Sequence, residues 1–127
     1  MHKESRYREM EFSEEKITRL LYSENCFCSL AKSGDTFIGF IWGLVQEAWF
    51  SDCKTGFDLG LYILPEYRGK SMAPIRLIKS FEEFCRSKNC YEISLSSSVK
   101  INDLTVSRLY EKLGYHECGF ITYKNIV

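Results

Sequence analysis

The stretch Pro65-Glu66-Tyr67-Arg68-Gly69-Lys70-Ser71-Met72-Ala73 decides the fold, because the hydrophobic pattern of the chain changes its period there. Before it, residues 57–64 alternate between two kinds of side chain, which predicts a strand. After it, apolar residues recur at the spacing i, i+1, i+4, i+7 and i+8, which predicts an amphipathic helix with this inner face: Leu77, Ile78, Phe81, Phe84 and Cys85. Pro74 suits the first turn of that helix, where a missing N–H costs nothing. The stretch is therefore a loop that joins a strand to a helix.

Strict alternation assigns the residues of the preceding strand to two faces. Asp58, Gly60 and Tyr62 share the polar face, and the apolar face holds Phe57, Leu59, Leu61 and Ile63. We therefore expect Asp58 to lie beside Tyr62.

The remaining segments predict a mixed α+β domain. Residues 13–21 read as a short helix capped by Ser13, and residues 26–32 and 36–49 read as a hairpin with its turn at Ser33-Gly34-Asp35. A further strand at 91–96 precedes a helix that Asn102 or Asp103 caps and Gly114 ends, and a last strand is expected at about 118–124. The expected order is α-β-β-β-α-β-α-β within a single domain, 1–127.

The net charge is zero, with 17 basic and 17 acidic residues, so a general attraction to nucleic acid or to an anionic membrane is not indicated. The charges are nevertheless segregated. Residues 68–88 hold six basic and two acidic residues, whereas residues 44–66 hold one basic and four acidic residues. The basic part of a candidate cleft between them suits phosphates and the acidic part suits a cation.

The sequence predicts a cytoplasmic protein without structural metal or disulfides. No apolar run reaches the 18 to 20 residues or so that span a bilayer, and the charged first residues do not form a secretory signal. The six cysteines form no Cys-x-x-Cys pair, and we expect them to be free and mostly buried thiols.

The loop at 68–73 is a candidate anion site, because the amides at a helix N-terminus point outward and Arg68 and Lys70 add positive charge. Gly69-Lys70-Ser71 has the ending of the nucleotide-binding P-loop. That motif needs a glycine where Leu64 stands, and its flanking strands belong to repeated βαβ units rather than hairpins. A P-loop hydrolase is therefore disfavoured.

The same loop resembles the acetyl-CoA signature of the GNAT superfamily of N-acetyltransferases, [Q/R]-x-x-G-x-[G/A], with Arg68 and Ala73 on pattern. The segment Leu109-Tyr110-Glu111-Lys112-Leu113-Gly114-Tyr115 is similar to the L-Y-x-K-x-G-[F/Y] motif of that family. The two motifs stand in the family's order and spacing, and the resemblance covers about residues 26 to 124.

This resemblance implies a GNAT fold: a mixed, mostly antiparallel sheet flanked by helices, with strands splayed at the acetyl-CoA site. It implies that strand backbone pairs with the pantetheine arm, at Leu61, Tyr62 and Ile63. It also implies that the loop holds the pyrophosphate, with Arg68, Gly69, Lys70, Ser71, Met72 and Ala73. Asn102, or Asp103 beside it, stands near the position where the family often uses an asparagine for the cofactor.

The chain departs from the family pattern in two further places. Ser71 stands where the family prefers glycine, and its side chain either crowds the pyrophosphate or donates a hydrogen bond to it. The N-terminal region offers only about 25 residues, as in compact bacterial or phage forms. The acceptor site is therefore expected to be more open, or to be completed by the second subunit of a homodimer.

The resemblance implies transfer of an acetyl group from acetyl-CoA to a primary amine by direct attack in a ternary complex. Asp58, seven residues before Pro65, is the expected general base, ahead of Glu47, Asp52 and Glu66. Tyr110 is expected to protonate the departing thiolate. Three aromatic residues are expected either to line an acceptor pocket or to belong to the core: Trp42, Trp49 and Tyr62.

The acceptor is expected to be an amine-bearing small molecule or a protein amine. The alternative is a non-catalytic module of the same fold that binds CoA or mediates assembly.

Overall fold

The computed structural model describes residues 13–96, 103–119, 122 and 124–126. Their elements follow the order α1 (Glu14–Leu21), β1 (Cys26–Ser33), β2 (Thr36–Glu47), β3 (Lys54–Ile63), the 3₁₀-helix η2 (Pro65–Tyr67), α2 (Ala73–Ser87), β4 (Cys90–Ser94) and α3 (Asp103–Lys112). The predicted hairpin, the central strand-loop-helix unit and all three predicted helices are present.

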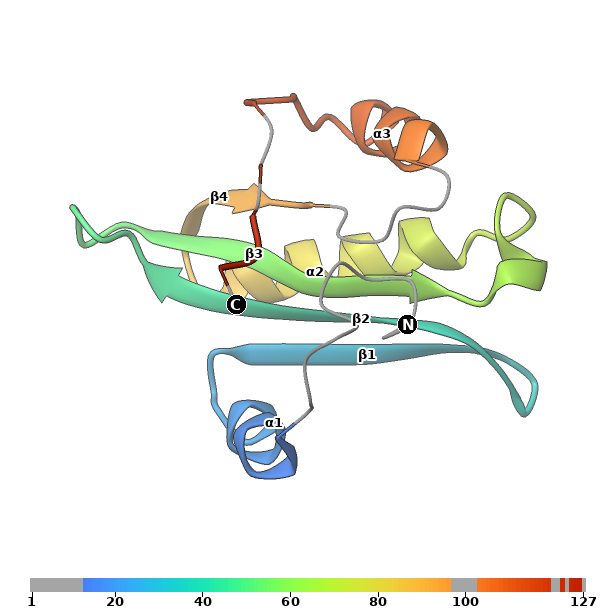
Figure 1. Ribbon diagram of the computed structural model, residues 1–127, viewed down its shortest axis with the longest axis horizontal. Coiled ribbons are helices and arrows are strands. Elements are labelled where there is room, and N and C mark those ends of the chain that lie inside the picture. The colour runs from blue at the N-terminus through green and yellow to red at the C-terminus, as the bar shows by residue number, and fades with distance from the viewer. Residues whose placement is uncertain (1–12, 97–102, 120–121, 123, 127) are drawn as a thin grey trace.

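The sheet has the strand order β1-β2-β3-β4, with two antiparallel pairs and a parallel pair between β3 and β4. A mixed, mostly antiparallel sheet is therefore confirmed. Figure 1 shows α1 beside the β1 edge, α3 beyond the β4 edge, and α2 lying along the sheet. The N-terminus of α2 lies at the end of the sheet where β3 finishes, because only η2 and a short loop separate them.

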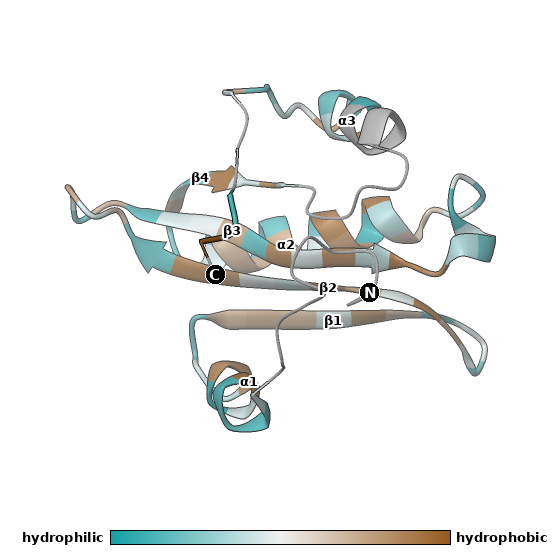
Figure 2. Cartoon of the chain, in the orientation of Figure 1, coloured by the Kyte–Doolittle hydropathy of each residue, from teal (hydrophilic) through white to brown (hydrophobic). Residues whose placement is uncertain are grey.

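The core lies between α2 and one face of the sheet. Its buried residues are Ile38, Ile41, Val45, Ile63, Ala73, Leu77, Ile78, Phe81 and Cys85. In Figure 2 the ribbon of α2 alternates between hydrophobic and hydrophilic residues, while η2 at the end of β3 is mostly hydrophilic. The apolar face predicted for α2 is thus confirmed, with Phe84 half-buried at its margin.

Two glycines let α2 approach the sheet closely. A Cβ atom at Gly43 would lie 2.4 Å from the Phe81 ring, and one at Gly56 would lie 2.4 Å from Cys85 Sγ. Such separations are too short for any side chain, so glycine at both positions makes room for the helix.

A β-bulge in β3 overturns the predicted division of that strand into two faces. Trp42 pairs with Gly60 and Gly43 pairs with Asp58, which leaves Leu59 as the extra residue. Because a bulge shifts the alternation by one residue, Asp58 lies on the face covered by α2, as its partner Gly43 does. Tyr62 lies on the other face and packs against Phe40, with 6.1 Å between the ring centroids. The expectation that Asp58 and Tyr62 share a face is therefore wrong.

Two smaller expectations also need correction. The described residues between 118 and 124 (Cys118, Gly119, Thr122 and Lys124) have no strand geometry, so the final strand is not found there. All six cysteines are free, as expected, but only Cys85 is buried. Cys28 is exposed on the edge strand β1 and Cys53 is exposed in the β2–β3 turn, so the thiols are not mostly buried.

Two absences apply to the described part of the chain. No helix there is long and apolar enough to cross a membrane. In the same residues no three His, Cys, Asp or Glu side chains come together as a metal site would require.

Candidate active site

The candidate site forms where β4 separates from β3. The parallel ladder ends at the pair Phe57 and Ser94. Just beyond it, the backbone N–H of Ser96 donates to Asp58 Oδ1 at 2.8 Å, so a side-chain carboxylate takes the place of a backbone acceptor. Beyond this point no described strand pairs with the β4 side of β3, which agrees with the strand splaying that the family resemblance implies.

Asp58 is a buried carboxylate, 9% exposed, with one oxygen fixed. The Ser96 hydroxyl also donates to Oδ1, at 3.3 Å. Burial raises the pKa of Asp58 from 3.8 to about 6, although the Ser96 hydrogen bonds act in the opposite direction. Both Ser96 donors bind Oδ1, so the Ser96 contacts leave Oδ2 for a proton from a substrate.

Tyr110, on α3, reaches the same point from the opposite side. Its hydroxyl donates to the backbone carbonyl of Ser96 at 3.3 Å. Burial raises the pKa of Tyr110 well above its ordinary value of 10, and the nearby carboxylate of Asp58 raises it further. The two side chains selected from the sequence as base and acid are therefore brought together around Ser96.

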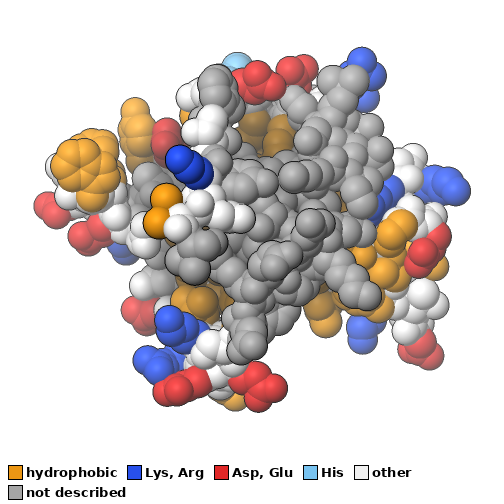
Figure 3. Space-filling view, in the orientation of Figure 1, with side chains coloured by type: hydrophobic (Ala, Val, Ile, Leu, Met, Phe, Trp, Pro, Cys, Tyr) orange, Lys and Arg blue, Asp and Glu red, His pale blue; other side chains and the backbone are white. Residues whose placement is uncertain are grey.

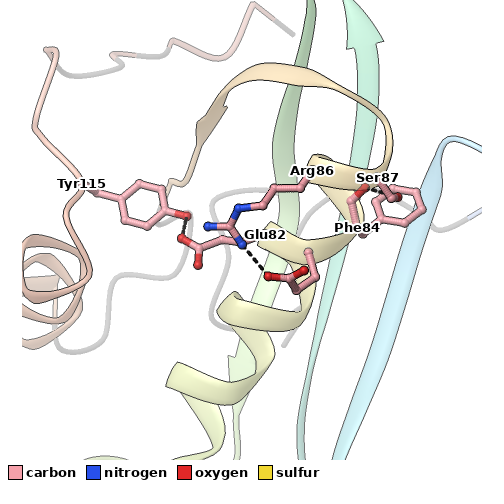
Figure 4. A network of polar contacts seen from close by, with 6 residues as sticks. Glu82, Phe84, Arg86, Ser87 and Tyr115 are labelled. Atoms are coloured by element: carbon pink, nitrogen blue, oxygen red, sulfur yellow. Dashed lines mark hydrogen bonds and ion pairs between the residues drawn. The ribbon is translucent and has the colours of Figure 1, made fainter.

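The end of α3 is tied to α2 by Tyr115, the last residue of the second sequence motif. The Tyr115 hydroxyl donates to Glu82 Oε2 at 2.7 Å, as Figure 4 shows. The Tyr115 ring also lies 6.0 Å from the Tyr110 ring. This link holds α3 where Tyr110 can reach Ser96. The neighbouring pair of Arg86 and Glu83 in Figure 4 is exposed and stays within α2.

The loop at 68–73 has the backbone that an anion site requires. Gly69 has a φ of 74°, a left-handed conformation that favours glycine. Arg68 Nε donates to the carbonyl of Ile63 at 2.8 Å, and its guanidinium lies 5.4 Å from the centre of the Tyr62 ring. Lys70 and Met72 are exposed beside the N-terminus of α2. Arg68 thus joins the loop to the end of β3.

Ser71 uses its side chain within the loop. Its Oγ accepts a hydrogen bond from Ala73 N–H at 3.0 Å, which satisfies one amide at the start of α2. The hydroxyl proton of Ser71 remains available to an external acceptor, whereas the Ala73 N–H does not.

Leu61, Tyr62 and Ile63 occupy the half of β3 that pairs only with β2 among the described strands. Leu61 pairs with the buried Ile41, and Ile63 is itself in the core, so backbone groups rather than these side chains face the open edge. Asn102 lies outside the described residues.

The other candidates do not join this cluster. Glu47 pairs with Lys54 at the far end of β3. Asp52 is exposed in the β2–β3 turn, and Glu66 is exposed in η2. Trp42 donates from Nε1 to Cys26 Sγ at 2.8 Å, and Trp49 is 95% exposed at the β2–β3 turn. Figure 3 shows hydrophobic side chains gathered at that tip of the molecule. Neither tryptophan belongs to the buried core.

Sequence reasoning missed Ser96 as a part of the site. Two of its three contacts use backbone groups, which any residue type would supply. The detectable signal is its place at the end of the predicted strand, with a side chain able to hydrogen bond.

Comparison with known proteins agrees with the fold described above. The model of the acetyltransferase (GNAT) family matches residues 1–115. No curated protein matches the chain. Among solved structures, an aminoglycoside acetyltransferase from an uncultured soil metagenomic sample superimposes with a TM-score of 0.76 at 18% identity, over 95% of this chain and 79% of that chain.

Two further solved structures share the fold. Glucosamine-6-phosphate N-acetyltransferase from Arabidopsis thaliana gives a TM-score of 0.73 at 14% identity, over 90% of this chain and 76% of that one. Aminoglycoside 6'-N-acetyltransferase from Acinetobacter haemolyticus gives 0.70 at 20% identity, over 91% and 83%. The family match spans most of the sequence and includes both motifs and the residues around Asp58 and Tyr110, so the chain belongs to the GNAT family of acetyltransferases.

Proposed function

We propose that this protein transfers the acetyl group of acetyl-CoA to a primary amine by direct attack in a ternary complex. The observation that carries the proposal is the convergence of Asp58 and Tyr110 on Ser96, at the point where β3 and β4 separate. A base and an acid that lie on opposite sides of one backbone segment suit a reaction in which one proton is removed and another is supplied.

Asp58 is the proposed general base. With a pKa of about 6 it is mostly ionised at neutral pH, yet it is a stronger base than an ordinary carboxylate. The ammonium form of the acceptor first loses one proton to solvent. As the neutral amine nitrogen then bonds to the thioester carbonyl carbon, Oδ2 of Asp58 accepts the second proton that the nitrogen loses. The carbon–sulfur bond then breaks and its electron pair leaves on the thiolate.

Tyr110 is the proposed acid that protonates this thiolate. The Asp58 carboxylate is one cause of the raised pKa of Tyr110, after burial. Once Asp58 has taken the proton of the amine, that charge is gone and the pKa of Tyr110 falls. Tyr110 is thus a better acid after the base has acted than before. Exchange with solvent afterwards returns both groups to their starting protonation states.

Acetyl-CoA is proposed to bind along the open half of β3 and the loop that follows. The backbone of Leu61–Ile63 is available to the pantetheine amides. The pyrophosphate is proposed to lie at residues 68–73, where Gly69 permits the turn and Arg68, Lys70 and the Ser71 hydroxyl supply positive charge and a donor. One solved GNAT relative in the comparison was determined with a CoA-containing bisubstrate analogue.

The proposed acceptor is an amine-bearing small molecule that is cationic in solution. Within the site, the support is the carboxylate of Asp58, the acidic side chain of residues 44–66 that lies where β3 and β4 separate. The names of the structural relatives, aminoglycoside and glucosamine-6-phosphate acetyltransferases, describe acceptors of this chemical class.

A thioester-release assay with acetyl-CoA and a panel of amines tests the proposal. Asp58→Asn and Tyr110→Phe are each expected to lower kcat/KM by about 10²- to 10⁴-fold, the usual contribution of general acid–base groups. Asp52→Asn and Tyr91→Phe are matched controls, because both residues are exposed and neither makes one of the hydrogen bonds to Ser96.

Acetyl transfer that survives both substitutions would contradict the assignment of base and acid. If calorimetry detects acetyl-CoA binding but no amine is acetylated, the non-catalytic CoA-binding module is favoured instead.

A further inference from the structure

We propose that Ser96 is a positioning residue that holds the base and the acid in one hydrogen-bonded unit, and that its hydroxyl favours the ionised form of Asp58. This inference rests on the proposed function for its catalytic meaning. Its structural basis is independent of catalysis, because one residue makes all three contacts.

The contacts of Ser96 divide between the two partners. Its N–H and its hydroxyl both donate to Oδ1 of Asp58, at 2.8 and 3.3 Å. Its carbonyl accepts from Tyr110 at 3.3 Å. Oδ1 therefore faces Ser96. Because Oδ1 is held in this way, Oδ2 is the oxygen that accepts the proton of the amine.

The position of Ser96 in the sheet explains why it can do this. The β3–β4 ladder ends at Ser94, two residues earlier, so the backbone of Ser96 is no longer engaged by β3. Its N–H and carbonyl are thus free to bind side chains. The bulge at Leu59 places the Asp58 side chain on the inner face, within reach of that N–H.

Ser96, together with the backbone N–H of Asp58 itself, favours the charged form of Asp58. Opposite Asp58 on β2 stands Gly43, and the α2 side chains over Gly43 and Gly56 are Phe81 and Cys85. Burial raises the pKa of Cys85 to about 12, so this thiol is neutral. From α3 comes the neutral Tyr110, and Glu82 of α2 binds Tyr115 instead. Within the described residues, no cation faces the carboxylate.

Removing the hydroxyl of Ser96 should therefore make Asp58 harder to ionise. The N–H contact remains in Ser96→Ala, so the carboxylate keeps its place while it loses one donor. A hydrogen bond of 3.3 Å to a charged group is at the weak end of the range. We expect the midpoint of Asp58 titration to rise by about half a pH unit.

The experiment compares Ser96→Ala, Ser96→Thr and Ser94→Ala in the full chain. The first readout is the titration of the Asp58 carboxyl carbon by ¹³C NMR, which needs no turnover. The second is the acid limb of the kcat/KM pH profile with an amine that the wild type acetylates. Ser96 is exposed, so a smaller side chain leaves no cavity, and Ser94→Ala changes the same residue type within the ladder.

The proposal expects the NMR midpoint to rise in Ser96→Ala and to stay at the wild-type value in Ser96→Thr and Ser94→Ala. The acid limb of kcat/KM should move by the same amount. An unchanged midpoint in Ser96→Ala, or an equal rise in Ser94→Ala, overturns the role of Ser96. A shifted NMR midpoint in a protein that acetylates no amine would instead refute the proposed function and leave the role of Ser96 intact.

Discussion

The two halves of β3 differ in what pairs with them. Residues 54–57 pair with β2 on one side and β4 on the other, under the buried residues of α2. From Asp58 onward, β2 is the only strand partner within the described residues. The first half is held by apolar packing and a complete ladder, and the second exposes backbone groups and carries a buried carboxylate.

This difference shows how one strand can serve both stability and the proposed chemistry. A carboxylate with a raised pKa costs folding free energy, because its charged form is poorly solvated in the fold. The fully paired half and its helix supply the packing that offsets such a cost. Substitutions in the two halves should therefore change stability in opposite directions.

The largest expected effect comes from the paired half. Phe81 is fully buried, and its ring lies over Gly56 in this half as well as over Gly43 of β2, so Phe81→Ala should lower the free energy of unfolding by about 3–5 kcal/mol. Urea denaturation followed by circular dichroism measures this loss. Phe50→Ala is the control, since Phe50 is 74% exposed and its loss should change stability by no more than about 0.5 kcal/mol. Equal losses in the two variants would break the comparison.

In the open half of β3, we expect a substitution to raise the free energy of unfolding rather than to lower it. Between pH 3.8 and about 6 the folded chain holds a proton on Asp58 that the unfolded chain has released. The free energy of unfolding therefore falls as pH rises through this window, by about 3 kcal/mol in total. Asp58→Asn removes this penalty and keeps an oxygen for Ser96 N–H. It should stabilise the protein by about 2–3 kcal/mol at pH 8 and by little near pH 4.

Denaturation at both pH values, with Asp52→Asn as the exposed control, measures this difference. A gain that does not depend on pH, or a loss at pH 8, would show that burial of the Asp58 charge is not what destabilises the open half.

The smallest effect concerns the link that holds α3 beside the open half. Tyr115→Phe removes the hydrogen bond to Glu82 and should cost about 1 kcal/mol, because the pair is only partly buried. Tyr91→Phe, at an exposed tyrosine, should cost nothing measurable. If the link positions Tyr110, Tyr115→Phe also lowers kcat in the acetyl-transfer assay, which a purely local loss would not do.

Much of the fold follows from periodicity. The spacing of Leu77 to Cys85 predicts α2 and its buried face, and Ser13 caps α1 as its position suggests, accepting from Lys16 N–H at 3.4 Å. The face of Asp58 is not predictable in this way. A bulge leaves no mark in a short alternating segment, so Asp58 was placed beside Tyr62 and on the wrong side of the sheet.

The site was predicted where side chains act and missed where the backbone acts. Asp58 and Tyr110 stand at positions that a family motif or spacing identifies, and the structure brings them together. Ser96 contributes mainly an N–H and a carbonyl, and such groups are common to nearly every residue. Only the way in which β4 leaves the sheet makes them available.

The extra residue at Leu59 has a consequence for how this chain should be aligned with its relatives. Before Leu59 the even-numbered residues of β3 face α2, and after it the odd-numbered residues do. Counting from Pro65 back to Asp58 therefore gives the right residue but the wrong face, unless the insertion is included. An alignment that moved a gap by one position across Leu59 would exchange a buried acid for a neighbour on the opposite surface, with hardly any change in its score.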